Sequence, residues 1–148
     1  MRLLVYIDGA SRGNPGPASV GVAFLDGSGK TVREHCRAIG TQTNNVAEYT
    51  ALLDALRLAR ELGATELKVH SDSQLLVRQV NGVYRIKNKS LQDLALEAAR
   101  LRRDLRGFEI VHVPREENTH ADRLANAALD ALKKTTAGPG SNGRVAAC

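Results

Sequence analysis

Aromatic and sulfur-containing residues are scarce in this 148-residue chain, which has no Trp, three Tyr, two Phe, one Met and two Cys. So few rings leave little material for stacking the bases of single-stranded nucleic acid. The spacing of Cys36 and Cys148 suggests no disulfide, and we expect both to be free thiols in a reducing, cytoplasmic setting. No apolar run approaches about 18 residues, so no transmembrane helix is expected. A strand pattern begins within two residues of the N-terminus, and we expect no secretory signal.

The rest of the composition is that of one globular domain. Apolar residues make up 43% of the chain and charged residues 25%, both ordinary values. The length is sufficient to bury one hydrophobic core. The formal net charge of +5 suits a polyanionic partner such as nucleic acid without requiring one.

Hydrophobic periodicity and turn residues predict a mixed α/β domain. Strands are expected at about 2–8, 18–25, 30–39, 66–70 and 107–113, and helices at about 44–62, 72–80, 90–105 and 118–134. The turn signal DGSG at 26–29 makes the first three strands an antiparallel meander, whereas the last two follow helices and suit parallel pairing. The predicted fold class is one mixed five-stranded sheet, three strands antiparallel and two parallel, flanked by helices. We expect a domain at 1–134, followed by a disordered tail or linker at 135–148.

Four acidic residues occupy the positions from which they could meet. Asp8 and Asp72 end apolar runs, and Glu48 and Asp122 lie near the starts of amphipathic helices. Strand ends and helix starts gather at one edge of an α/β sheet. Carboxylates gathered there would repel one another unless divalent cations neutralised them, which points to a metal-dependent phosphodiester hydrolase.

Each of these carboxylates also has a structural explanation when it is taken singly. Asp72 could cap a helix, and Asp8 could be a turn residue before a glycine. Glu48 could pair with an arginine. However, it lies four residues before Leu52 on the core-facing stripe of its helix, where a carboxylate needs a partner or a metal ion.

Four sequence stretches, each containing one of these acidic residues, carry a family resemblance. They are YIDGASRGNPGPASVG (6–21), TNNVAEYTALLDAL (43–56), HSDSQLLVRQVNG (70–82) and VPREENTHADRLAN (113–126). In this order, over residues 1–133, the chain resembles the type 1 ribonucleases H, specifically their short bacterial and archaeal-like members.

The resemblance implies the ribonuclease H-like fold and endonucleolytic cleavage of the RNA strand of an RNA–DNA hybrid. It implies Mg²⁺ or Mn²⁺ as cofactor, two ions per site, and products with 5′-phosphate and 3′-hydroxyl ends. Position by position, Asp8, Glu48, Asp72 and Asp122 match the family's catalytic, metal-binding carboxylates. Two ions can clamp the attacking water and the leaving oxygen of an in-line displacement, and Asp8 would bridge them.

The resemblance also implies residues that bind the substrate. Asn14, Asn44 and Asn45 match positions that reach the minor groove, where 2′-hydroxyls identify RNA. Thr43 matches a position that holds a phosphate of the DNA strand, and Asn88 matches a further polar contact. Asn44 and Asn45 could instead cap the helix that they begin.

Two departures from the family pattern affect function. Larger members carry a basic, Trp-bearing protrusion after the second helix, and here only residues 83–89 occupy that place. We therefore expect weaker hybrid affinity. The family's flexible-loop His before the last carboxylate is also missing, and Arg115 or Glu116 lies nearest its place as a possible auxiliary residue. His120 is on the helix and is not given that role.

Two rival interpretations remain open. One is another nuclease of the same fold, which would digest duplex DNA. The other is a non-catalytic nucleic-acid binding domain. In addition, this chain could be one domain of a longer bifunctional protein. We expect a monomer, since no long apolar stripe is left over.

Overall fold

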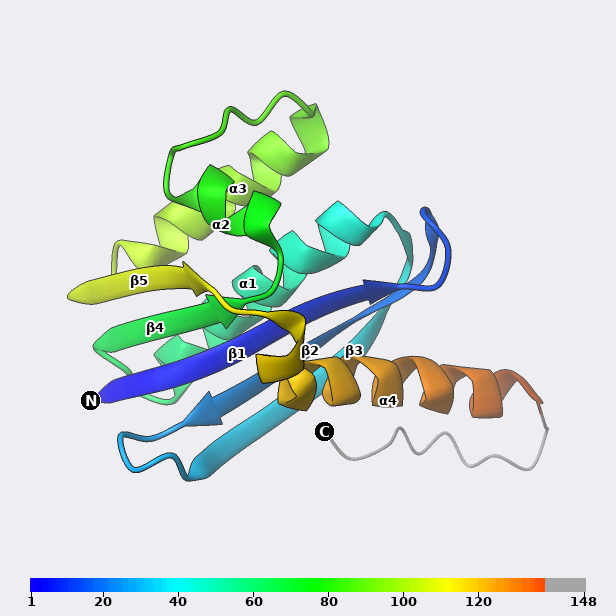
Figure 1. Cartoon of the computed structure of the whole chain (residues 1–148), viewed down its shortest axis with the longest axis horizontal. Helices are drawn as coiled ribbons and strands as arrows, with labels where there is room; N and C mark the ends of the chain where they lie inside the picture. The colour runs from blue at the N-terminus through cyan, green and yellow to red at the C-terminus, as the bar shows by residue number, and fades with distance from the viewer. Residues whose placement is uncertain (138–148) are drawn as a thin grey trace.

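A computed structural model describes residues 1–137 of the protein as a five-stranded sheet with helices on both faces (Figure 1). The strands are β1 (Arg2–Ser11), β2 (Gly16–Leu25), β3 (Thr31–Gln42), β4 (Glu66–Ser71) and β5 (Gly107–His112). The helices are α1 (Asn44–Glu61), α2 (Gln74–Val80), α3 (Lys89–Arg102) and α4 (Thr119–Ala137), with a single 3₁₀ turn, η1 (Arg115–Glu117), before α4. Helix α4 runs three residues past its expected end at 134, and the expectation for 138–148 lies outside the described residues.

The sheet has the strand order β3-β2-β1-β4-β5. The pairs β1/β2 and β2/β3 are antiparallel, and the pairs β1/β4 and β4/β5 are parallel. The predicted arrangement of three antiparallel and two parallel strands is therefore confirmed.

Side-chain alternation along the strands divides the core between the two faces. Val5 and Ile7 on β1 and Phe24 on β2 join the larger cluster, which contains the apolar stripe of α1. Ala23, the neighbour of Phe24, points the other way into a smaller cluster with Leu124 of α4. The sheet is thus a middle layer with α1 on one face and α4 on the other (Figure 1).

Strand β1 is longer than predicted, because it continues through Asp8 to Ser11 instead of ending at Asp8. Its parallel pairing with β4 stops at Ile7, but its antiparallel pairing with β2 continues from Asp8 to Ser11. The density of Gly and Pro at 9–17 had suggested a loop throughout, whereas only residues 12–15 connect the strands. Asp8 therefore lies inside a strand, just beyond the point where β4 ends.

Side-chain caps fix the starts of α1, α2 and α3, the last through Asn88. The hydroxyl of Thr43 accepts from the Val46 amide at the start of α1, so Thr43, and not Asn44 or Asn45, is the cap. Ser73, rather than Asp72, caps α2 by accepting from the Leu76 amide. The carboxylate of Asp72 is therefore not used as a helix cap.

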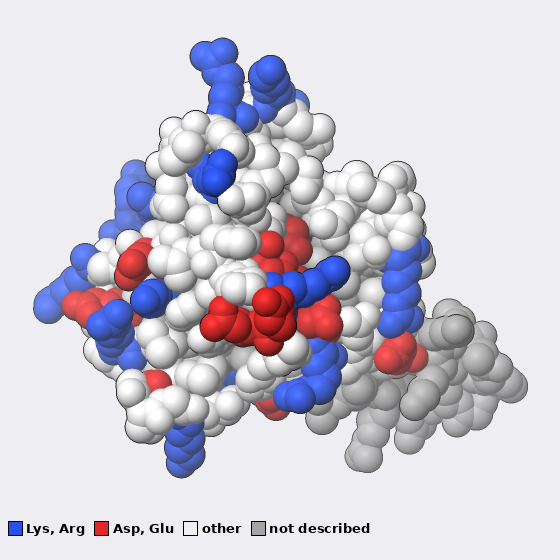
Figure 2. All heavy atoms as spheres, viewed as in Figure 1, with Lys and Arg blue, Asp and Glu red and all other residues white. Residues whose placement is uncertain are grey.

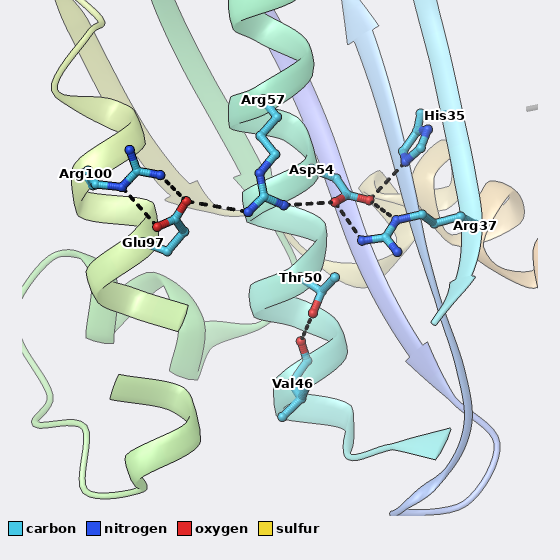
Figure 3. Close-up of polar contacts among 8 residues, drawn as sticks. All are labelled: His35, Arg37, Val46, Thr50, Asp54, Arg57, Glu97 and Arg100. Carbon is cyan, nitrogen blue, oxygen red and sulfur yellow. Dashed lines mark hydrogen bonds and ion pairs between the residues drawn. The ribbon is translucent and has the colours of Figure 1, made fainter. Parts of the chain in front are cut away.

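An ion-pair network connects β3, α1 and α3 (Figure 3). The buried carboxylate of Asp54 on α1 accepts two hydrogen bonds from Arg37, at 2.8 and 3.0 Å, and lies 3.0 Å from Nε2 of His35. Arg57 continues the network to Glu97 on α3 at 3.6 Å. Burial raises the pKa of Asp54, but the hydrogen bonds from His35 and Arg37 outweigh it and hold that pKa below its ordinary value. The network fastens edge strand β3 to the central helix.

Cys36 lies on β3 in the smaller cluster and is disulfide-bonded, so the expectation of a free thiol there is wrong. The cysteine argument for a reducing compartment therefore lapses. The expectation for Cys148 lies outside the described residues. Within residues 1–137, no helix is both long and apolar enough to cross a membrane.

We predict that Asp54→Asn lowers the free energy of unfolding at pH 7 by about 1–3 kcal/mol. This is less than the usual cost of breaking a fully buried pair, because the side chain of Arg37 is 46% exposed. A depressed carboxyl pKa stabilises the fold above its unfolded-state value, and this contribution is lost as pH falls through the folded-state pKa. In urea unfolding curves, the difference between wild type and variant should therefore shrink below about pH 4.

The control is Asp93→Asn, which removes an exposed pair with Lys89 and should change stability by less than about 0.5 kcal/mol. Equal stability of Asp54→Asn and wild type at pH 7 would contradict the role given to the network.

Candidate active site

Two strands and two helices supply the predicted carboxylates. Asp8 and Asp72 each follow a residue of the last paired position between β1 and β4, Ile7 and Ser71. Glu48 lies near the start of α1, and Asp122 is in the first turn of α4. Four positions far apart in sequence are thus brought to one edge of the parallel part of the sheet.

Two glycines allow the helix starts to approach the strands this closely. A Cβ atom on Gly9 would lie 2.3 Å from the backbone nitrogen of Glu48. A Cβ atom on Gly21, the β2 partner of Asp8, would lie 2.2 Å from the carbonyl oxygen of Ala121 in α4. Any side chain at either glycine would push its helix, and the carboxylate it carries, away from Asp8.

The carboxylates form a close cluster. Asp8, Glu48 and Asp72 each offer an oxygen within 4.8 Å of the others, and Asp122 is near enough to hydrogen-bond Asp8. Asp8 and Glu48 are buried, at 6% and 4% exposed. The cluster opens into a cleft of about 460 Å³, lined by Asp8, Gly9, Ala10, Ser11, Arg12, Asn44, Glu48, Asp72, Ser73, Arg115, Asp122 and Asn126. Figure 2 shows acidic groups gathered at the centre of this face, with basic groups around them.

The electrostatics of the cluster call for positive charge. Burial, and after it the charge of Asp72, raises the pKa of Asp8 to about 8, while Arg115 acts in the opposite direction. Burial, followed by the charges of Asp8 and Asp72, raises the pKa of Glu48 well above its ordinary value. The folded protein therefore favours protons on these groups wherever no cation offsets their charges.

The donor set fits a divalent cation. Oε1 of Glu48 accepts from the Gly9 amide at 3.2 Å, but the buried Oε2 has no hydrogen-bond partner among the described residues. A buried carboxylate oxygen without a partner is costly. Hard cations such as Mg²⁺ prefer carboxylate oxygens as ligands, so Asp8, Glu48, Asp72 and Asp122 are chemically suited to hold them.

The residues predicted to bind substrate lie in different places. Asn44 lines the cleft, and its backbone amide donates to Oδ1 of Asn14 at 3.0 Å, which ties the β1–β2 connection to α1. Thr43 caps α1 and Asn45 is exposed beside it. Asn88 caps α3 by accepting from the Leu91 amide and is not among the residues lining the cleft. Substrate contact by these residues stays a prediction.

The structure also brings forward cleft residues that the sequence reasoning did not single out. Arg12 lines the cleft and donates to Asp130 at 2.8 Å and to Asn126 at 3.3 Å, both on α4. Ser73 and Asn126 line it as well. Asn126 lies four residues after Asp122, a helical spacing that could have indicated it; nothing in the sequence indicated that Arg12 reaches α4. Of the two candidates for the missing His, Arg115 lines the cleft and Glu116 does not.

The sequence is similar to a known family and to known proteins. A family model described as reverse transcriptase-like matches residues 6–128. A bifunctional protein of Mycobacterium tuberculosis is 42% identical over 148 residues, which cover 99% of this chain and 41% of that protein. Ribonuclease HI of Halobacterium salinarum is 43% identical over 129 residues, which cover 87% of this chain and 65% of that one. The chain thus spans 41% and 65% of the lengths of these two relatives.

Solved structures of related proteins share this fold. The crystal structure of ribonuclease H1 from Halobacterium salinarum has a TM-score of 0.86 at 43% identity and covers 88% of this chain and 98% of that one. The structure of LC11 ribonuclease H1 in complex with an RNA/DNA hybrid has a TM-score of 0.85 at 40% identity and covers 88% and 99%. The chain therefore belongs to the ribonuclease H family. Only residues 81–88 separate α2 from α3.

We predict that Asp8→Asn stabilises the metal-free protein. A carboxyl whose folded pKa is raised loses stabilisation as pH rises from its unfolded value, about 4, toward the folded value, here about 8. Removing that charge should raise the free energy of unfolding by roughly 1–4 kcal/mol at pH 8, and by little near pH 4. Urea unfolding in the presence of a chelator measures both values.

Mg²⁺ should stabilise wild type more than Asp8→Asn, because a ligand that binds only the folded state adds more stability the tighter it binds. Asp104→Asn, which removes an exposed partner of Arg60, is the control and should change stability by about 0.5 kcal/mol at most. A less stable Asp8→Asn at pH 8 would show that Asp8 is not under repulsion.

Proposed function

We propose that this domain is an endonuclease that hydrolyses the RNA strand of RNA–DNA hybrids with Mg²⁺ or Mn²⁺, leaving 5′-phosphate and 3′-hydroxyl ends. The observation that carries the proposal is the cluster of Asp8, Glu48 and Asp72, two of them buried, with an orphaned oxygen on Glu48. Such a cluster is electrostatically unfavourable for a structural role alone. Family membership and the hybrid complex of LC11 ribonuclease H1 support the substrate class.

The four carboxylates would share two ions. Asp8 would contact both, Glu48 and Asp72 would complete one site, and Asp122 would complete the other. When bound, such a pair supplies activation of the attacking water and charge stabilisation of the leaving oxygen. Gly9 contributes by donating its amide to Oε1 of Glu48, while the buried Oε2 has no hydrogen-bond partner among the described residues and could serve as a ligand.

Asn44 in the cleft, together with residues close to it, would select and orient the substrate. Asn14, Asn44 and Asn45 would contact base edges and 2′-hydroxyls of the RNA strand. The hydrogen bond between Asn14 and Asn44 supports this role, because it holds two of these residues side by side. Thr43 would hold a phosphate of the DNA strand beside them. Asn88, which lies outside the cleft, would act only on a more distant part of the duplex.

Arg115 would act as an auxiliary group at the cleavage point. Arg115 lines the cleft, and its guanidinium forms no ion pair with any side chain that the structure describes, although it lies near carboxylates. An arginine that is not committed to a carboxylate can bind a phosphate through parallel hydrogen bonds. This supports a role toward the scissile phosphate or the product in place of the missing His.

We further propose that the domain acts as a monomer, with weaker hybrid affinity than members that carry the basic protrusion. Support comes from the short connection between α2 and α3 and from the site, which residues of a single chain complete. Because the chain spans only part of two of its relatives, activities of any longer protein stay outside this proposal.

An end-labelled RNA–DNA hybrid, tested with Mg²⁺ or Mn²⁺ beside duplex DNA, single-stranded RNA and duplex RNA, provides the test. We expect internal cleavage of the hybrid's RNA strand, abolished by chelator. Asp8→Asn should reduce the rate on the order of 10⁴-fold or more, since it removes a member of a catalytic unit. Digestion of duplex DNA alone would indicate another nuclease of this fold, and hybrid binding without cleavage would indicate a non-catalytic domain.

For Arg115 we predict that Arg115→Ala lowers kcat/KM on the hybrid by about 10–100-fold, the scale of losing a hydrogen bond to a charged group. Arg115→Lys should retain part of the rate, because it keeps the charge without the planar pair of donors. The matched control is Arg103→Ala, which removes an equal charge at the end of α3, outside the cleft. An equal loss of kcat/KM in both alanine variants would show that Arg115 acts only through the net charge of the protein and has no specific role in the cleft.

A further inference from the structure

Asn118 lies at the junction of η1 and α4 and is completely buried. Its Nδ2 atom donates to the carbonyl oxygen of Ile7 at 2.8 Å and to Oδ2 of Asp72 at 3.2 Å. A side-chain amide has two N–H hydrogens, and both are used here. One asparagine therefore connects β1, at the residue before Asp8, with the Asp72 carboxylate after β4.

The Oδ1 atom of Asn118 shows that this residue is not a helix cap. An asparagine before a helix normally caps it, with Oδ1 accepting a backbone amide of the first turn. Here the buried Oδ1 of Asn118 has no hydrogen-bond partner among the described residues. Rotating the amide would not help, because Oδ1 would then face two acceptors, the Ile7 carbonyl and the Asp72 carboxylate. The side chain is thus oriented toward Asp72 and β1, at the expense of an unsatisfied oxygen.

Asp72 needs such a contact because of its neighbours. Its carboxylate lies within 4.8 Å of oxygens of Asp8 and Glu48, which repel it, and it is the least buried of the three. Among the groups that the structure describes, no other one donates a hydrogen bond to its carboxylate. Without Asn118, the Asp72 side chain would be free to turn away from the cluster.

We infer that Asn118 is a positioning residue, which holds the Asp72 carboxylate in the orientation that binds a divalent cation. The inference rests on the metal site of the proposed function and adds a residue that contacts neither ion nor substrate. Groups that hydrogen-bond a metal ligand typically change metal affinity by about 10–100-fold when they are removed.

The test is the affinity of Asn118→Ala for Mn²⁺ and Mg²⁺ without nucleic acid, measured by isothermal titration calorimetry below the unfolding temperature. We expect affinity to fall about 10–100-fold, while hybrid binding in chelator, measured by fluorescence anisotropy, changes less than about twofold. In an Asp72→Asn background, Asn118→Ala should cause no further loss of metal affinity, since the two residues act through one contact.

The matched control is Ser19→Ala. Ser19 is also completely buried and connects a strand to α4 by donating to the Ala125 carbonyl at 2.6 Å, but its hydroxyl is bonded to a backbone carbonyl and not to a cleft carboxylate. The Ser19→Ala protein should be less stable than wild type but should bind the metal ions with unchanged affinity. If Asn118→Ala fails to fold, Asn118→Ser, which retains one donor in a smaller side chain, takes its place with the same expectation of weaker metal binding.

Wild-type metal affinity in a folded but less stable Asn118 variant would overturn the inference, and so would a wild-type protein that binds neither ion. The calorimetric readout is independent of hydrolysis. Weakened metal binding in the variant, with no hybrid cleavage by wild type, would therefore support the positioning role while the proposed function fails.

Discussion

The contact of two helix backbones with two strands at Gly9 and Gly21 is the constraint on which the cleft depends. At both positions a single methyl group would overlap backbone atoms of the helix start, at 2.3 and 2.2 Å. The glycines flank Asp8, one next to it in β1 and the other across from it in β2. The absence of two side chains thus sets how near Glu48 and Asp122 come to Asp8, and with it the strength of their electrostatic coupling.

Two buried acidic centres in the same fold show opposite electrostatic designs. Asp54 is surrounded by His35, Arg37 and Arg57, and the protein's own cations keep its pKa low. In the cleft, Asp8 and Glu48 are buried beside further carboxylates, and their pKa values rise. The first centre lowers the free energy of the folded state by itself. The second contains negative charge that no cation among the described residues fully neutralises and that a bound cation would neutralise. Stability thus favours a buried carboxylate beside arginines, whereas metal binding favours buried carboxylates beside one another.

Much of this arrangement could be predicted from the sequence, because it follows from periodicity and local chemistry. The strand and helix patterns gave the mixed sheet, and Glu48 on the apolar stripe of α1 indicated a carboxylate that faces inward. The meeting of the four carboxylates could be expected from strand ends and helix starts, but other contacts between distant segments could not be predicted. The extension of β1 through Asp8 depends on continued pairing with β2, the disulfide state of Cys36 depends on tertiary proximity, and the orphaned oxygen of Asn118 is visible only once its neighbours are placed.

Helix α4 links the β1–β2 connection to the cleft and fixes the distance between them. Asp122, Asn126 and Asp130 follow one another at four-residue spacing, and Nδ2 of Asn126 donates back to the carbonyl of Asp122 while Arg12 bonds Asn126 and Asp130. At 1.5 Å per residue, Asp122 and Asp130 are about 12 Å apart along the helix axis. The distance between the β1–β2 connection and Asp122, the last cleft carboxylate, is therefore set by the rise of helix α4.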